Sequence, residues 1–262
     1  MPIENITNHI VNWLKDYAQH ANSKGFVIGV SGGIDSAVTS TLCALTGLPT
    51  LCVDMPIHQA QNQVDRAHAH IKWLQQKYDT VLFEKVALSD VYDGLIKAFP
   101  AIENEEDRLM ALVNTRARLR MTSLYYFAGL HNYLVAGTGN KVEDFGVGFY
   151  TKYGDGGVDL SPIADLTKTE VYAVATYLGI NTDIIKAPPT DGLWGDDRTD
   201  EDQIGASYPE LEWAMEMADT QAKSTDFSDR QKEVFDIYTR LHNANKHKME
   251  PIPVCVIPKE LK

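Results

Sequence analysis

The sequence predicts an α/β fold: a doubly wound parallel sheet with helices on both faces, and extra helices at its N- and C-terminal ends. Short β-branched and apolar runs alternate with helical apolar patterns from residue 26 to residue 137. Strands separated by helices need right-handed crossovers, which place helices on both faces of a parallel sheet. A glycine-rich turn follows the first strand, and ligands bind such sheets beyond the carboxyl ends of the strands. We expect one domain, 1–262, with a ligand crevice at that edge.

Hydrophobic periodicity assigns the elements in order. The first half is predicted to hold helix 3–21, strand 26–30, helix 35–46, strand 48–54, helix 59–77, strand 80–87, a helix over 89–97 capped by Ser89, and a helix over 105–130 that can break near Asn114. The second half is predicted to hold a strand within 131–137, a helix over 168–178 with a capping box from Thr167 to Glu170 and a stop at Gly179, helices over 208–218 and 229–245, and an extended tail at 251–253.

The composition excludes several classes of function. A formal net charge of -12 argues against bulk nucleic-acid binding, which needs a basic face. No apolar run is long enough to cross a membrane, and the amphipathic N-terminal segment lacks the features of a signal peptide. Cys43, Cys52 and Cys255 are scattered in apolar sequence, so we interpret them as reduced structural thiols in a cytoplasmic protein.

The most informative motif is Ser-Gly-Gly-x-Asp-Ser at residues 31–36, between a strand and a helix. Gly32 and Gly33 can adopt positive φ and approach a ligand closely, and the amides of such a turn converge on an anion at the helix N-terminus. Asp35 would repel a bare phosphate, so the motif indicates a magnesium polyphosphate. The alternative is an ordinary tight connection in which Asp35 complements the helix dipole. The loop is neither a Walker A motif nor a dinucleotide fingerprint.

A second polar segment, residues 137–143, follows a strand directly. Thr138 and Glu143 could hold ATP and its metal there, since Mg²⁺ takes one or two carboxylates from a protein. Without the first motif, a solvated carboxylate at a helix start would explain Glu143 equally well.

Three arginines stand at alternate helix positions, which puts Arg116 and Arg120 on one face and points Arg118 elsewhere. Arg118 can bind a phosphate or carboxylate, although surface salt bridging explains the run as well. Residues 150–159 combine Lys152 and Asp159 with glycines, and either form a turn or order over a ligand.

Lys168 lies in the first turn of its helix, where the dipole disfavours a cation unless an anion is near. Glycine and proline density makes the segments 146–157 and 188–198 costly to order, so we expect them to become ordered when ligands bind.

The turn at residues 31–36 resembles that of N-type ATP pyrophosphatases, and the whole set of motifs resembles ammonia-dependent NAD synthetases. The motifs that carry the resemblance are 31–36, 114–120, 137–143, 149–159, 166–168, 188–190 and 247–248. Gly139-Asn140-Lys141 departs from the Asp-His-Ala that many members carry. The resemblance implies an adenine nucleotide alpha hydrolase-like fold. It also implies amidation of deamido-NAD by ammonia through an acyl adenylate, with AMP and pyrophosphate released.

The resemblance also implies roles for individual residues. ATP is expected to contact Gly29, Val30, Ser31, Gly32, Gly33, Ile34, Asp35, Ser36, Thr138, Lys168 and Thr190. Deamido-NAD is expected to contact Arg118, Lys152, Asp159, His247 and Lys248. Asp35 and Glu143 are expected to bind Mg²⁺, and the catalytic candidates are Asp35, Lys152, Asp155, Asp159 and Lys168. Asp155 and Asp159 also suit the ammonia step, although no base is assigned.

The family is a homodimer with a shared dinucleotide site, and the apolar residues of helix 105–130 suit that interface. No glutaminase segment is recognised, so ammonia is the expected nitrogen donor. One alternative is a tRNA-modifying enzyme of the same ATP-splitting group, which would need a basic face and often paired cysteines. The other is a nucleotide sensor with a universal-stress-protein fold, which would bind ATP without forming AMP.

Overall fold

A four-stranded parallel sheet forms the centre of the computed structural model, which describes residues 2–100, 102–190, 199–220 and 227–262. The strands are β1 (Gly25–Gly29), β2 (Thr50–Asp54), β3 (Val81–Lys85) and β4 (Tyr133–Val135). Their order in the sheet is β3-β2-β1-β4, and each neighbouring pair is parallel. After β3 the chain crosses to the far side of β1, so the switch point of the winding lies between β1 and β4.

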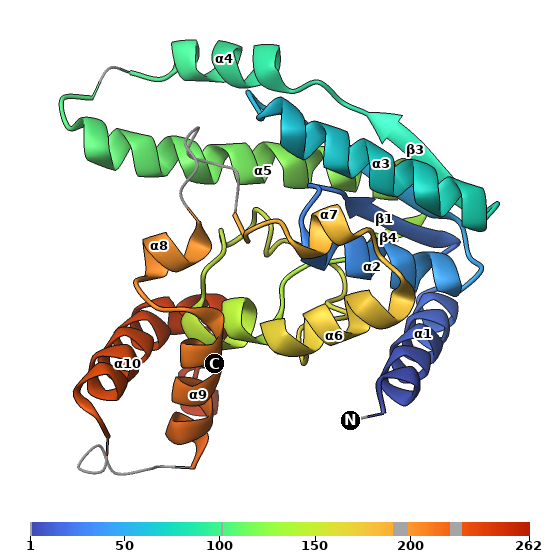
Figure 1. The fold of residues 1–262 in the computed structure, drawn as a ribbon. Helices are drawn as coiled ribbons and strands as arrows, with labels where there is room; N and C mark the ends of the chain where they lie inside the picture. The colour runs from blue at the N-terminus through green and yellow to red at the C-terminus, as the bar shows by residue number, and fades with distance from the viewer. Residues whose placement is uncertain (1, 101, 191–198, 221–226) are drawn as a thin grey trace.

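Helices cover both faces of the sheet, as the sequence predicted (Figure 1). One face carries α1 (Ile3–His20), α2 (Ile34–Leu45), α3 (Gln61–Lys77) and α6 (Lys168–Leu178). The other face carries α4 (Ser89–Ala98) and α5 (Glu105–His131). Alternation along β1 explains the two cores, because Phe26 and Ile28 pack toward α1, α2 and α6 while Val27 packs toward the α4 and α5 side.

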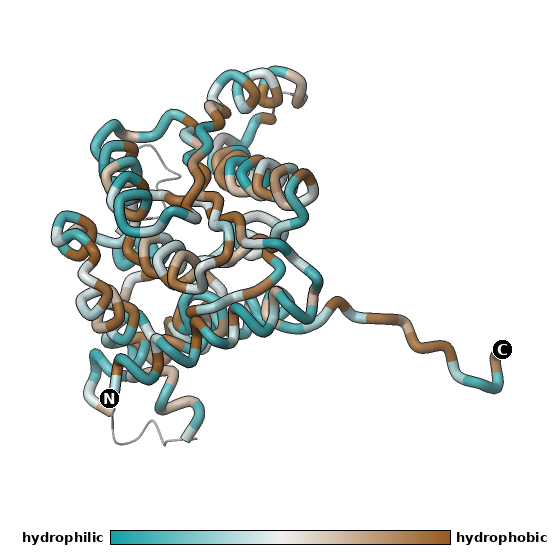
Figure 2. Tube along the Cα trace, turned by 90° about the vertical axis from the view of Figure 1, so that its right-hand side faces the viewer, coloured by the Kyte–Doolittle hydropathy of each residue, from teal (hydrophilic) through white to brown (hydrophobic). Residues whose placement is uncertain are grey.

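The remaining elements follow the last strand. They are η1 (Val142–Val147, a π-helical turn), α7 (Thr182–Ile185), α8 (Asp200–Ile204), α9 (Tyr208–Asp219), α10 (Asp229–Met249) and η3 (Lys259–Leu261). η1, α8, α9 and α10 share a hydrophobic core of their own, away from the sheet. The last residues leave α10 as an exposed tail that projects from the body (Figure 2).

Several local expectations were wrong. α5 is continuous through Asn114, whose side chain instead accepts a hydrogen bond from Thr151. Ser89 is the first residue of α4 rather than its cap, and its hydroxyl accepts from the backbone of His58. The helices α7 and α8 were not predicted, while Thr167, Glu170 and Gly179 cap α6 as predicted.

Cys43 and Cys52 are buried, and burial raises the pKa of the Cys52 thiol to about 12. Cys255 lies exposed in the tail, so the expectation of a structural role is wrong for that residue. Over the described residues, every helix is too short or too polar to span a lipid bilayer.

Candidate functional site

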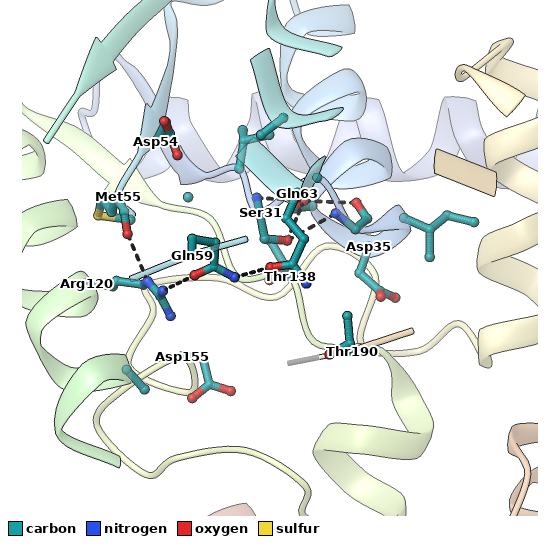
Figure 3. A pocket seen from close by; sticks show the side chains of 18 of the residues that line it. Ser31, Asp35, Asp54, Met55, Gln59, Gln63, Arg120, Thr138, Asp155 and Thr190 are labelled. Carbon is teal, nitrogen blue, oxygen red and sulfur yellow. Dashed lines mark hydrogen bonds between the residues drawn. The ribbon is translucent and has the colours of Figure 1, made fainter. Parts of the chain in front are cut away.

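A cavity of about 260 Å³ opens beyond the carboxyl ends of β1, β2 and β4 (Figure 3). The end of each strand leads into a segment that lines the cavity: residues 29–36 at the end of β1, 53–56 at the end of β2 and 136–138 after β4. Chain segments far apart in sequence therefore meet at the switch point of the sheet, where open α/β sheets bind their ligands.

One of the two glycines in the turn at residues 31–36 has the positive φ expected of an anion-binding loop. Gly32 adopts φ +79°, and a Cβ there would lie 2.6 Å from the carbonyl oxygen of Gln63. Gly33 instead has an extended backbone with φ -90° and caps α2, so the expectation of positive φ holds only for Gly32. Ser31 and Ser36 hold the turn: the Ser36 hydroxyl donates to the Gly33 carbonyl at 3.0 Å and accepts from the Ser31 amide at 3.2 Å.

All eleven residues expected to contact ATP line this one cavity. They are Gly29, Val30, Ser31, Gly32, Gly33, Ile34, Asp35, Ser36, Thr138, Lys168 and Thr190. Glu143 and Asp155 line it as well. The fold thus places these side chains around one space of suitable size for part of a nucleotide, and their contact with ATP stays a prediction. Residues 191–198 of the expected mobile loop lie outside the described part of the chain.

Lys168 is the electrostatic centre of the cavity. Its side chain is buried, and its ammonium donates to Asp35 at 2.6 Å and to Glu143 at 3.1 Å. Burial alone would lower the pKa of Lys168, but the two carboxylates raise it above its ordinary value. The cation that looked misplaced at a helix N-terminus is therefore neutralised by side chains from α2 and η1.

Asn140 explains why Asp35 faces Lys168. The buried Asn140 side chain donates to the other oxygen of Asp35 at 3.1 Å, and its own carbonyl oxygen accepts from the amides of Val142 and Glu143. The side-chain amide of Asn140 thus holds both the start of η1 and the Asp35 carboxylate in place. Sequence reasoning named the Gly139-Asn140-Lys141 segment only as a departure from the family pattern, and missed this role.

Arg120 is a second residue that sequence reasoning left without a role. It donates to the carbonyl of Met55 at 3.1 Å and to the Gln59 side chain at 2.8 Å, and Gln59 contacts Gln63 (Figure 3). Arg116 lies on the same side of α5, over the ring of Tyr92. The helical spacing predicted that Arg116 and Arg120 share a face. The position of Gln59 just beyond a strand end was the sequence feature that could have predicted its contact with Arg120.

Four of the five residues expected to bind deamido-NAD form a second cluster. Arg118 donates to the carbonyl of Lys152 at 3.3 Å, and the Lys152 ammonium donates to the carbonyl of His247. Lys248 donates to the carbonyls of Gly148 and Tyr150 at 2.8 Å each. Hydrogen bonds to backbone carbonyls therefore join the C-terminal end of α10 to residues 148–152.

Asp159, the fifth, lies apart from that cluster. Its carboxylate accepts from the backbone of Val135 in β4 at 2.8 Å and from the hydroxyl of Tyr125 in α5 at 3.0 Å. Burial and the neighbouring Asp159 raise the pKa of Tyr125. Asp159 therefore borders the α5 surface, and it does not line the cavity.

Two acidic groups near the cavity hold their protons unusually well. Burial raises the pKa of Asp155 to about 6, although the Thr151 amide, which donates to it at 2.9 Å, acts in the opposite direction. Burial, with Glu143, Asp155 and Asp35 nearby, raises the pKa of Asp144 to about 8. Asp144 is therefore largely protonated at neutral pH and Asp155 partly so, which limits the negative charge on this side of the cavity.

The sequence matches known proteins over nearly its whole length. A family model described as NAD synthase matches residues 6–252. The NH3-dependent NAD synthetase of Carboxydothermus hydrogenoformans is 38% identical over 87% of this chain and 91% of that protein. The protein of the same name from Methanosarcina mazei is 38% identical over 97% of this chain and 98% of its own length.

Solved structures of similar sequence share the fold over nearly the whole chain. An NMN synthetase from Francisella tularensis has a TM-score of 0.82 and 30% identity, with 99% of both chains covered. An NH3-dependent NAD synthetase from Campylobacter jejuni, in complex with nitrate, has a TM-score of 0.79 and 25% identity, with 98% of this chain and 100% of that chain covered. The sequence match, the parallel sheet and the cavity beyond its strand ends agree, and the chain belongs to the NAD synthase family.

Proposed function

We propose that the cavity activates the nicotinate carboxylate of deamido-NAD with ATP, so that ammonia can convert it to the amide. The chain is thus an ATP-dependent ligase that forms NAD, AMP and pyrophosphate, the last step of NAD biosynthesis. The observation that carries this proposal is the Lys168–Asp35–Glu143 constellation beside the Gly32 turn, in a chain of this family.

In the first step, an oxygen of the nicotinate carboxylate attacks the α-phosphorus of ATP, and the bond from that phosphorus to the bridging oxygen of pyrophosphate breaks. Negative charge grows on the departing pyrophosphate. The turn at residues 31–36 and the N-terminus of α2 supply amides and a positive dipole end for this charge. The ammonium of Lys168, at the same cavity wall, stabilises it further.

In the second step, ammonia attacks the carbonyl carbon of the acyl adenylate, and the bond from that carbon to the AMP oxygen breaks. An ammonium ion must lose one proton to become the nucleophile, and the nitrogen loses a second proton to water as the amide forms. Asp155 lines the cavity with a pKa of about 6, so it can hold an ammonium ion as a carboxylate at neutral pH. Asp159 is the other candidate for this step, and it lies outside the cavity, as does the catalytic candidate Lys152.

The constellation also fits a magnesium ion. The ammonium of Lys168 contacts both Asp35 and Glu143, so one cationic centre can reach both carboxylates at once. Among the described residues no group of three or more histidine, cysteine, aspartate or glutamate side chains is arranged to hold a metal. Two carboxylates are enough for Mg²⁺, because ATP phosphates and water supply the other ligands. When bound, Mg²⁺ neutralises charge on the phosphates.

A homodimer that completes the dinucleotide site is consistent with the surface of α5. Four large apolar residues of this helix are well exposed: Leu109, Met110, Tyr126 and Leu130, at 46%, 49%, 65% and 60%. Tyr126 and Leu130 lie one turn apart on the same side of α5, and apolar surface there can mark an interaction site. Asp159 lies beside Tyr125 of the same helix, so a partner seated there would approach an expected deamido-NAD residue. We also propose that residues 1–262 act as one domain in the cytoplasm.

Product analysis tests this function. Purified protein with ATP, deamido-NAD, Mg²⁺ and ammonium should form NAD, AMP and pyrophosphate in equal amounts, and ammonia-free glutamine should not replace ammonium. AMP formation separates an enzyme from a nucleotide sensor. Nicotinate mononucleotide, offered in parallel, tests the alternative raised by the structural likeness to an NMN synthetase. A higher kcat/KM for the mononucleotide, or ADP as product, would contradict the proposal.

A further inference from the structure

The hydrogen-bond network of the cavity continues behind its wall into α9. Tyr208, the first residue of α9, is only 3% exposed. Its phenol oxygen lies 2.5 Å from Glu143 Oε1 and 3.2 Å from Asp200 Oδ2, and the Lys168 ammonium lies 4.6 Å from the centre of its ring. Asp200, Glu143 and Lys168 all line the cavity, whereas Tyr208 does not.

A phenol carries one proton and therefore donates fully to one acceptor. The shorter contact identifies Glu143 as that acceptor. Glu143 Oε1 then receives two hydrogen bonds, one from a fixed phenol and one from the ammonium of Lys168. Such charge-assisted bonds are stronger than bonds between neutral groups, so they define the direction of the carboxylate.

The backbone around Tyr208 is itself held in place. Ser207 and Glu210 form a capping box at the start of α9, and Pro209 stands in the first turn. The amide of Tyr208 donates to the side chain of Glu201 in α8 at 2.9 Å. The ring packs in the core shared by η1, α8, α9 and α10, so it has little freedom to follow Glu143 if that side chain moves.

We propose that Tyr208 is a positioning residue of the reaction: it keeps the Glu143 carboxylate pointed into the cavity when Lys168 turns from the carboxylates to the ATP phosphates. The proposal rests on the function given above. With Lys168 engaged elsewhere, Glu143 would lose one of its two donors, and the phenol alone would hold it ready for the metal of ATP. The aromatic ring, lying beside the ammonium, provides a favourable face for Lys168 in its resting position.

The test replaces only the hydroxyl. Tyr208→Phe keeps the ring, its packing and its contact with Lys168. Titration with Mn²⁺ in the presence of a non-hydrolysable ATP analogue, followed by electron paramagnetic resonance, measures metal affinity without turnover. We expect the dissociation constant for Mn²⁺ to rise about tenfold, which corresponds to about 1.4 kcal/mol. In steady state the Mg²⁺ concentration for half-maximal rate should rise similarly, with kcat at saturating Mg²⁺ and the KM for ammonium close to wild type.

The matched control is Tyr238→Phe, a buried tyrosine of α10 in the same core. If Tyr208 acted only in folding, the two variants would lower the unfolding temperature to similar extents and leave metal affinity unchanged. 3-Fluorotyrosine at position 208 keeps the hydroxyl and should retain wild-type affinity, and it also decides the question if the phenylalanine variant folds poorly. Unchanged Mn²⁺ affinity in Tyr208→Phe, or equal loss in the fluorotyrosine protein, overturns the proposal. The titration needs no product, whereas failure of the wild type to form NAD would overturn the proposed function separately.

Discussion

Lys168 and Asp35 meet at 2.6 Å although 133 residues separate them in the chain. One residue opens α6 and the other lies in the first turn of α2. Both stand beyond the strand ends, so the doubly wound topology brings them together. The pair joins the anion-binding turn to the acidic side of the cavity, and most of the chemistry proposed above depends on it.

Asp35→Asn should lose activity by at least two orders of magnitude while the fold is kept. The amide is isosteric, but it cannot neutralise a cation beside the phosphates, and it weakens the partner of Lys168. NAD formation at ordinary Mg²⁺ gives the rate, and circular dichroism checks the fold. Asp165→Asn is the control, because that carboxylate is 98% exposed in a surface pair with Lys141. Near-normal turnover by Asp35→Asn would contradict the assigned role.

Lys168→Met should destabilise the free protein by about 3–5 kcal/mol, because it leaves two carboxylates without their buried counter-charge. Urea unfolding measures the loss of stability. Lys141→Met removes an exposed ion pair and should change stability by less than about 1 kcal/mol. If the Lys168 variant is no less stable than the Lys141 variant, the ion pairs of Lys168 with Asp35 and Glu143 do not stabilise the fold.

His70 should make the protein less stable in mild acid. It is 1% exposed beside Ser40, and burial lowers its pKa from 6.5 to about 4, although the nearby Ala37 backbone opposes this. Between those pH values the unfolded chain binds a proton that the folded chain does not. Stability therefore falls as pH drops through that window, by about 3 kcal/mol at most.

His70→Gln should remove that part of the pH dependence. Asp144 and Asp155 have raised pKa values and act in the opposite direction, so the difference between variant and wild-type curves isolates His70. His9→Gln, at an exposed position of α1, is the control. Parallel unfolding curves for His70→Gln and wild type from pH 6.5 to 4 would refute the prediction.

The exposed face of α5 should be the contact between subunits. The double substitution Tyr126→Glu and Leu130→Glu places charges at two positions one turn apart, and it should shift the protein from dimer to monomer in sedimentation velocity. Because the dinucleotide site is expected to be shared, the KM for deamido-NAD should rise more than the KM for ATP. Tyr177→Glu, on exposed surface of α6, should stay dimeric. A monomeric wild type, or a dimeric double variant, would refute this interface.

The sequence was sufficient to predict the winding of the sheet and the convergence of its strand ends. The alternation of patterns is local, and the position of a ligand crevice follows from topology. Residues such as Ser31, Thr138 and Lys168 each follow a strand or open a helix, so their meeting could be expected before any coordinates.

Long-range side-chain partners could not be predicted in this way. Tyr208 hydrogen bonds to Glu143, and Asn140 to Asp35, across long sequence separations, and no periodicity marks them. Asp159 belongs to a motif that looks continuous in sequence, yet its carboxylate faces Val135 and Tyr125 rather than the cavity. Spacing along a loop does not determine which way a side chain turns, because a turn can direct neighbours to opposite sides.

Isotope transfer tests the central claim most directly, namely that this cavity joins the substrate carboxylate to the α-phosphorus of ATP. Deamido-NAD labelled with ¹⁸O in both nicotinate carboxylate oxygens is converted with ATP and ammonium, and the products are separated for mass spectrometry. An acyl adenylate requires one ¹⁸O in each AMP, one in the amide of NAD and none in pyrophosphate. Unlabelled AMP, or label recovered in a phosphate that is not part of AMP, would contradict the account.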